Sequence, residues 1–279
     1  GAGMKLFSEG ENRRKWLTPG ERAVMQKDFN EIWKVRMVRN TLILVPALLV
    51  VILAVVYLLM IWFVPPERMN GVEQMMKLVP PDLRGYFSAR QSLFYLMENV
   101  VCPMFFLMIP LMVSTVTAAC SFVGEKERGT IETLLLTPLR VRSLFKAKVF
   151  GCALVSLIVT GISFFAFLVV VGIGDLLLKM PFFLNWNWIV MLLVVSPSLT
   201  LFGVIFMVLV SGRSKSYMES MQLSGYVVLP LVLLMIGQFT GLFQLDALIL
   251  LAIGAGVFVL DFILGGISAR SFTPEKLMK

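Results

Sequence analysis

The 279-residue chain contains no histidine. This excludes Ser-His-Asp triads, H-E-x-x-H zinc sites and any metal centre that depends on imidazole ligands. Cysteine is scarce as well. The three cysteines, Cys102, Cys120 and Cys152, lie within or beside apolar runs and show no C-x-x-C spacing. We interpret them as small buried apolar residues, and we predict neither a disulfide nor a zinc site.

Two further absences concern nucleotides and charge. The sequence has no G-x-x-x-x-G-K-[ST] motif, so the chain cannot hold nucleotide phosphates in a P-loop of its own. Only 15% of the residues are charged and 58% are hydrophobic, whereas soluble domains carry about 25% charged residues. The composition is therefore that of a membrane protein. With no nucleophile motif and no paired carboxylates expected inside the membrane, we predict that the chain is not an enzyme and binds no cofactor or metal itself.

Long apolar runs dominate the rest of the sequence. A helix that crosses a bilayer needs about 20 mainly apolar residues. We predict an all-α integral membrane protein with six spans: Thr41–Val64, Asn99–Val123, Phe145–Val171, Trp188–Val210, Ser220–Thr240 and Ala247–Ser268. The fifth of these is the weakest candidate, because it contains Gly225, Pro230, Gly237 and Gln238, which neighbouring helices must accommodate.

The net charge of +8 reflects topology rather than a nucleic-acid partner. Positively charged residues stay on the cytoplasmic side of short loops. Most of the 25 Lys and Arg residues fall in alternate connections, with 9 in residues 1–40, 6 in 124–148, 2 in 211–219 and 3 in 269–279. We therefore predict that the protein lies in a bacterial-type cytoplasmic membrane and that both of its termini are in the cytoplasm.

The segments outside the spans are short. Residues 1–19 are predicted to be flexible, and Gly1–Gly3 before Met4 is interpreted as a cloning scar. Residues 20–39 are predicted to form an amphipathic helix that lies in the lipid headgroups or packs on a cytoplasmic partner. Its apolar face comprises Met25, Phe29, Ile32, Trp33 and Met37. The six-span domain covers 40–268, and 269–279 form a cytoplasmic tail.

A charged segment with helix signals separates the second span from the third. Thr130 is suited to cap a helix through its hydroxyl, and Glu132 then lies in the first turn, where a carboxylate is favoured. Pro138 discourages continuation. We predict a short surface helix of about two turns, within residues 125–138, that is better placed to contact a soluble partner than lipid.

The order of residues in this segment resembles the signature of the type-2 family of ABC transporter permeases, E-R-E-x-G-T-[LIM]-E-x-L-L-x-[TS]-P. Only Lys126 departs from its fixed positions, in place of Arg. The resemblance implies the transmembrane subunit of an ATP-driven exporter, in which two six-span subunits enclose the pathway. Two separate ATP-binding subunits would hold ATP and magnesium. A homodimer is favoured over pairing with a second, related permease, and both stay open.

In this family the short helix lies in a cleft of the ATP-binding subunit and is called the coupling helix. The resemblance implies charge-assisted contacts by four residues, Glu125, Glu127, Arg128 and Glu132. It also implies that Gly129 permits the tight turn into the helix, and that Leu134 and Leu135 fill an apolar recess of the ATP-binding subunit. The implied coupling residues are Glu125, Glu127, Arg128, Gly129, Thr130, Glu132, Leu134, Leu135, Thr137 and Pro138.

Two polar residues within the spans are candidates for the pathway or for helix packing. Asp261 is the only formal charge predicted well inside a span, and Gln238 lies in the fifth span. An intramembrane carboxylate marks a functional site by default, although a structural pairing is the alternative.

The otherwise apolar spans favour hydrophobic or amphipathic cargo (peptide, drug or lipid), with peptides preferred. The alternative function is a membrane anchor or sensor that recruits a cytoplasmic ATPase without transporting anything.

Overall fold

The computed structural model describes residues 17–125, 129–138, 140–212, 214, 216–240 and 246–271. The predicted N-terminal segment up to residue 16 lies outside this part of the chain. The same applies to Glu127, Arg128 and most of the predicted tail. Every regular element of the described residues is a helix, as the sequence predicts.

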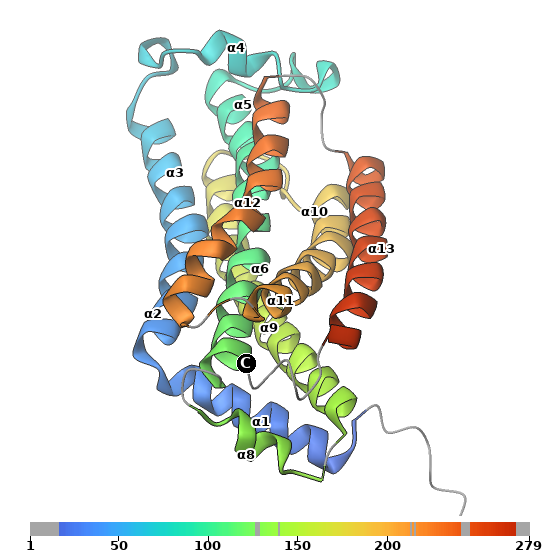
Figure 1. Ribbon diagram of the computed structural model, residues 1–279. Coiled ribbons are helices and arrows are strands. Elements are labelled where there is room, and N and C mark those ends of the chain that lie inside the picture. The colour runs from blue at the N-terminus through green and yellow to red at the C-terminus, as the bar shows by residue number, and fades with distance from the viewer. Residues whose placement is uncertain are drawn as a thin grey trace, which may run out of the picture.

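Six of these helices are long and apolar enough to cross a membrane, which confirms the predicted number of spans. Figure 1 shows them as a bundle with α4 (Val72–Met76) at one end and α1 (Pro19–Lys34) and α8 (Ile131–Leu135) at the other. The six helices are Arg36–Phe63, Ala89–Val123, Val141–Leu177, Trp186–Ser211, Met218–Phe239 and Ala247–Arg270.

Three spans contain α-helical and π-helical pieces in sequence. Two of the π-helical turns, η4 (Met97–Val101) and η6 (Met191–Val195), lie just before Pro103 and Pro197. Proline has no amide hydrogen to donate, and its ring collides with the carbonyl four residues earlier, so a wider turn at these two places relieves the clash. The first span is α2 (Arg36–Pro46), η1 (Ala47–Ile52) and α3 (Leu53–Phe63). The second is α5 (Ala89–Leu96), η4 (Met97–Val101), α6 (Cys102–Ala118) and η5 (Ala119–Val123). The fourth is α10 (Trp186–Val190), η6 (Met191–Val195) and α11 (Ser196–Ser211).

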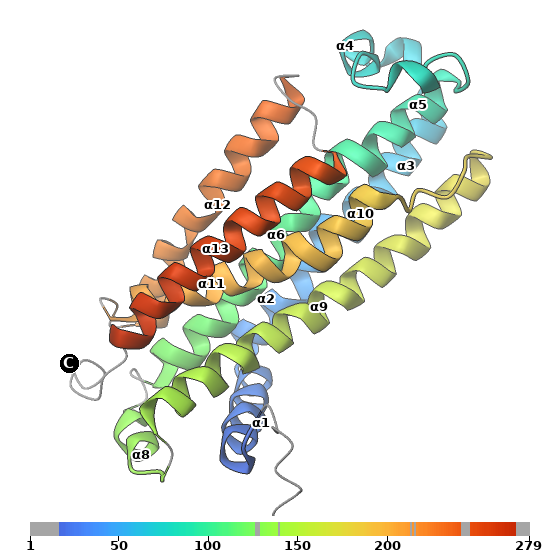
Figure 2. The same cartoon turned by 90° about the vertical axis from the view of Figure 1, so that its right-hand side faces the viewer.

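The other three spans are single helices, α9 (Val141–Leu177), α12 (Tyr217–Phe239) and α13 (Ala247–Ser271). The second span lies at the centre of the bundle, because 72% of its most apolar stretch is buried, against 22% for the first and 17% for the sixth. Figure 2 shows α6 enclosed by the other spans, with α13 and α12 on one side and α9 on the other.

The second span begins ten residues before the predicted Asn99. Ser88 and Gln91 form a capping box, in which the Ser88 hydroxyl accepts from the Gln91 amide at 3.3 Å and the Gln91 side chain accepts from the Ser88 amide at 3.0 Å. This starts α5 at Ala89 and places Glu98 inside the helix. The segment before it contains only α4 and two short 3-10 turns, η2 (Pro66–Arg68) and η3 (Pro81–Leu83).

The helix predicted over 20–39 ends early, because Val35 is extended and separates α1 from α2. Thr18 and Glu21 cap α1 reciprocally. Figure 1 shows α1 lying across the end of the bundle. The predicted apolar face is wrong in part: the stripe that α1 buries includes Val24, Asp28 and Ile32, whereas Phe29 is exposed.

Candidate functional site

Three buried charges gather where α1 crosses the bundle. Asp28 comes from α1, Glu125 follows the second span and Lys148 lies near the start of α9. Each residue is at most 2% exposed. A buried charge is costly unless it is paired and hydrogen-bonded, so this cluster, which we call the basal ion network, depends on its internal contacts.

Lys148 is the centre of the basal ion network. Its ammonium group donates to both carboxylate oxygens of Asp28 at 3.1 Å, and to the backbone oxygen and the hydroxyl of Ser121 at 3.1 Å. The Ser121 hydroxyl in turn donates to Asp28 Oδ2 at 2.7 Å. The ammonium also lies 5.7 Å from the centre of the Phe122 ring, in cation–π range. These contacts join α1, the second span and the third span.

Glu125 extends the network to α8. Its Oε1 accepts from Lys27 Nζ at 2.9 Å and lies 3.7 Å from Lys148 Nζ. The Thr130 hydroxyl donates to Glu125 Oε2, and the Thr130 amide donates to the Glu125 backbone oxygen at 3.0 Å. Glu125 and Thr130 therefore lie side by side, just before α8 begins.

The charges of this network shift two pKa values in opposite directions. Burial acts to raise the pKa of Glu125, but the Lys148 charge, the Thr130 hydroxyl and Lys27 outweigh it, so this pKa is lowered. Burial acts to lower the pKa of Lys27, but its hydrogen bond and its attraction to Glu125 outweigh it, so this pKa is raised. Both groups are therefore held in their charged forms.

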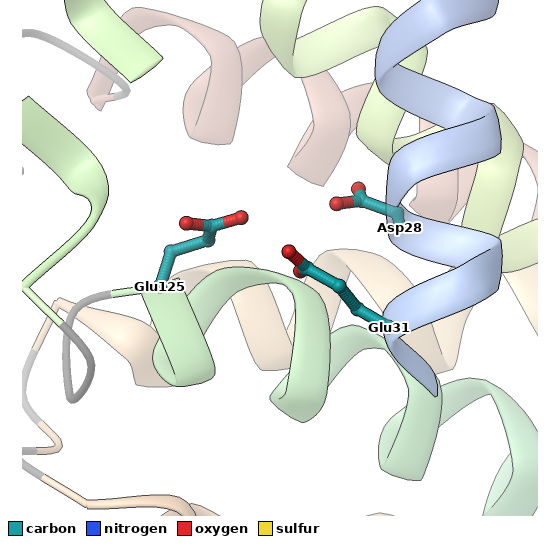
Figure 3. Close-up of side chains that lie close together, drawn as sticks. All are labelled: Asp28, Glu31 and Glu125. Atoms are coloured by element: carbon teal, nitrogen blue, oxygen red, sulfur yellow. The ribbon is translucent and has the colours of Figure 1, made fainter. Parts of the chain in front are cut away.

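Figure 3 shows that Asp28, Glu31 and Glu125 face one another, and their carboxylate oxygens lie within 4.8 Å of one another. Such a group of oxygens could hold a cation. Here lysine supplies the positive charge: Lys148 contacts Asp28, and Lys27 lies 2.9 Å from Glu125 and 3.7 Å from Glu31. We interpret the three carboxylates as part of an ion network rather than as a metal site.

The short helix α8 packs directly on this network. It has five residues, shorter than the predicted two turns, and Ile131 and Leu134 on its inner side are buried. Leu134 joins an apolar cluster with Ala118 and Phe122 from the second span and Leu144 from α9. The space left between α8 and the network is only about 20 Å³. The short helix is therefore a fixed part of the bundle end.

Two predicted details of this segment need correction. The Thr130 hydroxyl does not cap α8, because it donates to Glu125 instead of accepting from an amide of the helix. Leu134, expected to fill a recess in the partner, is only 8% exposed and packs within its own chain, whereas Leu136 is 85% exposed. Leu135 is partly buried. The most exposed leucine of this segment is thus Leu136, which directly follows the last residue of α8.

The remaining predicted residues lie around α8. Gly129 has φ +68°, a left-handed conformation that favours glycine at the entry to α8. Glu132 and Pro138 are exposed, and Thr137 is partly buried with its hydroxyl donating to the Leu134 backbone oxygen at 2.7 Å. Glu127 and Arg128 lie outside the described residues. The exposed residues are therefore Glu132 and Thr133 in α8 and Leu136 and Pro138 in the turn that follows it.

Sequence reasoning missed Asp28, Ser121 and Lys148. A signal for Asp28 is present, since it lies four residues from both Val24 and Ile32, on one face of a helix. Lys148 gives no comparable signal, because a lysine near the end of an apolar run usually reaches the membrane interface. The pairing of the two joins residues 120 positions apart.

Asp261 and Gln238 are not brought together. Asp261 lies in the second half of α13, is 4% exposed, and neither carboxylate oxygen has a hydrogen-bond partner among the described residues. Gln238 lies one residue from the end of α12. It lines a space of about 10 Å³ with Asn99 and Trp188, which is room for about one water molecule.

Comparison with known proteins gives one match. A family model described as "ABC-2 family transporter protein" matches residues 22–264. These residues include α1 without its first three residues, α8, and all six spans except the last residues of α13. No curated protein and no solved structure matches the chain.

Proposed function

Because the chain belongs to the ABC-2 transporter family, whose permeases associate with an ABC ATP-binding subunit, we propose that it forms the translocation pathway of an ATP-driven exporter. Two copies of the chain would enclose this pathway. ATP and magnesium would bind to two copies of a separate subunit, which is consistent with the lack of a P-loop in this sequence.

The observation that carries this proposal is the attachment of α8 to the bundle. A helix that transmits movement must be fixed to the spans and must expose a face to its partner. The basal ion network and Leu134 provide the attachment, and Glu132 and Leu136 provide the exposed face. We propose that α8 is the coupling helix, and that movement of the ATP-binding subunits rocks the second and third spans through it.

The α1/α8 end would then face the cytoplasm. Support comes from the distribution of charge, since the segments at this end carry many of the Lys and Arg residues and positively charged loops stay in the cytoplasm. The cargo would be hydrophobic or amphipathic, with peptides preferred, because the spans carry few charges that could bind a small ion.

Co-purification from membranes in mild detergent, followed by an ATPase assay, tests this proposal. We expect a P-loop subunit to be retained, and the substitution Glu132→Lys to weaken its retention. Loss of a charge-assisted contact costs about 1.5–3 kcal/mol, which is roughly a 10- to 100-fold loss of affinity. Glu73→Lys is the matched control, because Glu73 is also exposed but lies on α4 at the other end.

The outcomes separate the alternatives. Retention of the P-loop subunit by Glu132→Lys at the control level would contradict coupling through α8. A retained subunit that hydrolyses ATP without moving labelled amphipathic peptides into sealed inverted vesicles would favour an anchor or sensor. A chain that purifies alone in several detergents would contradict the transporter proposal as a whole.

A further inference from the structure

Two carboxyl groups meet inside the bundle at the end opposite α1 and α8. Glu98 lies in η4 of the second span and is 1% exposed, and Asp175 lies near the end of α9 and is 2% exposed. The two side chains lie close enough for one carboxyl group to donate a hydrogen bond to the other. The sequence predicts no paired carboxylates within the spans, but the structure extends the second and third spans so that they include these two acids. Neither residue takes part in the proposed coupling.

The pair lacks a positive partner. Among the described residues, neither carboxyl group forms an ion pair with Lys or Arg, and Lys179 on the turn after α9 is exposed. Asp175 Oδ2 accepts from the Phe183 amide at 3.1 Å. Glu98 Oε1 and Asp175 Oδ1 are buried and receive no donor from the described chain. Each acid therefore has one oxygen that still needs a hydrogen.

The other titratable groups near the pair do not supply that hydrogen. Tyr95 and Cys102, both in the second span, lie close enough to interact electrostatically with Glu98. The Cys102 thiol instead lies 3.0 Å from the Met97 sulfur. No hydrogen bond from Tyr95 to Glu98 is present among the described residues.

Two carboxylates in contact within an apolar interior cannot both be ionised, because each charge is poorly solvated and repels the other. A single proton held between them removes one charge and also supplies the missing donor. We infer that Glu98 and Asp175 form a proton-binding site, in which one carboxyl group is protonated and donates a hydrogen bond to the other.

The bound proton completes a set of contacts between the second span and the turn after the third. The side-chain amide of Gln91 donates through Nε2 to the Leu178 backbone oxygen at 2.9 Å, and the side-chain amide of Asn185 donates through Nδ2 to Asn99 Oδ1 at 2.9 Å. Phe94 packs so closely on Gly174 that an added Cβ would lie 2.4 Å from its ring. Figure 2 shows α5 and the end of α9 at the same end of the bundle.

An aromatic cluster packs beside the Glu98–Asp175 pair. Phe183, whose amide binds Asp175, packs edge to face on Phe167 and Trp188, with ring centres 5.5 Å apart in both cases. Loss of the proton would place two negative charges in this dry site, and their repulsion would separate the second span from the third. The site is thus a proton-dependent latch at the end where an exporter would release its cargo.

Infrared difference spectroscopy of the full chain in lipid nanodiscs tests the proton directly. A protonated carboxyl group gives a carbonyl band that a carboxylate lacks. We expect the band in the wild-type chain at neutral pH and its loss in both Glu98→Gln and Asp175→Asn, since either substitution leaves a single carboxyl group that an amide can satisfy. Glu73→Gln, on an exposed residue, should leave the band unchanged. Asp261→Asn identifies any contribution from Asp261, the other buried acid whose oxygens lack a donor among the described residues.

A second measurement covers the case in which a variant does not fold. The unfolding midpoint of the wild-type chain should fall as alkaline pH removes the proton, together with loss of the band, and Glu98→Gln should remove this dependence. Absence of the band at neutral pH, or a band that both variants keep, would overturn the inference. A midpoint that rises with added Ca²⁺ or Na⁺ at constant pH would show a cation in place of the proton. None of these readouts involves ATP or cargo, so they stand apart from the proposed function.

Discussion

Lys148 shows how much of this structure depends on single residues. It is one of the largest side chains that are fully buried, and its ammonium group contacts Asp28, Ser121 and Glu125. A buried ion pair adds little net stability over apolar residues of the same size, but removing one partner is strongly destabilising because the other charge is left alone. The network therefore specifies where α1 lies more than it stabilises the fold.

This argument gives a prediction for a double-mutant cycle. Lys148→Met leaves Asp28 buried without its main partner, and we expect it to lower the free energy of unfolding by about 3–5 kcal/mol. Asp28→Leu combined with Lys148→Met should lose less than either single substitution. The measurement is denaturant unfolding of the full chain in detergent, with Arg142→Met, on an exposed residue of α9, as control. Additive effects of the two substitutions would contradict the pairing.

Glu125 gives a prediction for pH. Its pKa in the folded chain is lowered, so its contribution to stability is present above the unfolded value of about 4.3 and is lost as pH falls through the folded value. The raised pKa of Lys27 acts in the opposite direction, since its contribution is lost only as pH rises through alkaline values. We expect the attachment of α8 to weaken in acid and not between neutral pH and moderately alkaline pH.

The measurement is the unfolding midpoint of the full chain between neutral and acidic pH. Glu125→Gln should lower the midpoint at neutral pH and reduce its further fall in acid, because the amide does not titrate. Glu132→Gln, on the exposed side of α8, is the control. If the midpoint of Glu125→Gln falls in acid as far as that of the wild-type chain, other carboxylates are responsible for the fall.

At the scale of elements, hydropathy predicted all six spans but not their ends. The second span was predicted too short because Arg90 and Glu98 lower the mean hydropathy at its start, although Ser88 caps the helix and Asp175 lies beside Glu98. The inner face of α1 was predicted in part wrongly for a similar reason. From the sequence alone Asp28 is expected to be a polar surface residue, because its partner Lys148 is far away along the chain.

The entry to α8 gives a prediction at this scale. Gly129 has φ +68°, and a Cβ there meets nothing within 4 Å, so Gly129→Ala adds backbone strain of about 1–2 kcal/mol without a clash. We expect α8 to shift and the ATPase activity of the purified complex to fall. Gly129→Pro should have a larger effect, because proline cannot adopt a positive φ.

Gly71 provides a matched control for that substitution. It also has a positive φ, +81°, with nothing within 4 Å of an added Cβ, but it precedes α4 at the opposite end. Gly71→Ala should therefore cost similar stability and leave the ATPase activity unchanged. Equal loss of activity in both variants would mean that strain in general, and not the position of α8, is responsible.

At the scale of the whole molecule, α9 connects the two polar sites. It has 37 residues without proline, and at 1.5 Å per residue it is about 55 Å long. Lys148 lies near its first residue and Asp175 near its last. A single helix therefore joins the basal ion network to the Glu98–Asp175 pair. Movement of α8 would reach the other end of the bundle through this helix, and release of the proton there would act on the same helix.

Asp261 lies apart from both sites, and its lack of partners leads to the last prediction. A carboxylate near the middle of a membrane helix costs about 2.5–3.5 kcal/mol on insertion scales, and no described residue donates to Asp261.

If Asp261 were present for stability, the described chain would offer it a donor. We therefore expect Asp261→Asn to leave the unfolding midpoint of the isolated chain unchanged or to raise it, and to lower the cargo-stimulated ATPase activity of the complex. Ser268→Ala, at another buried position of α13 without a hydrogen-bond partner, is the control and should affect neither. A lower midpoint in Asp261→Asn would instead assign the carboxylate to packing, with its donor supplied by residues beyond those described or by a second copy of the chain.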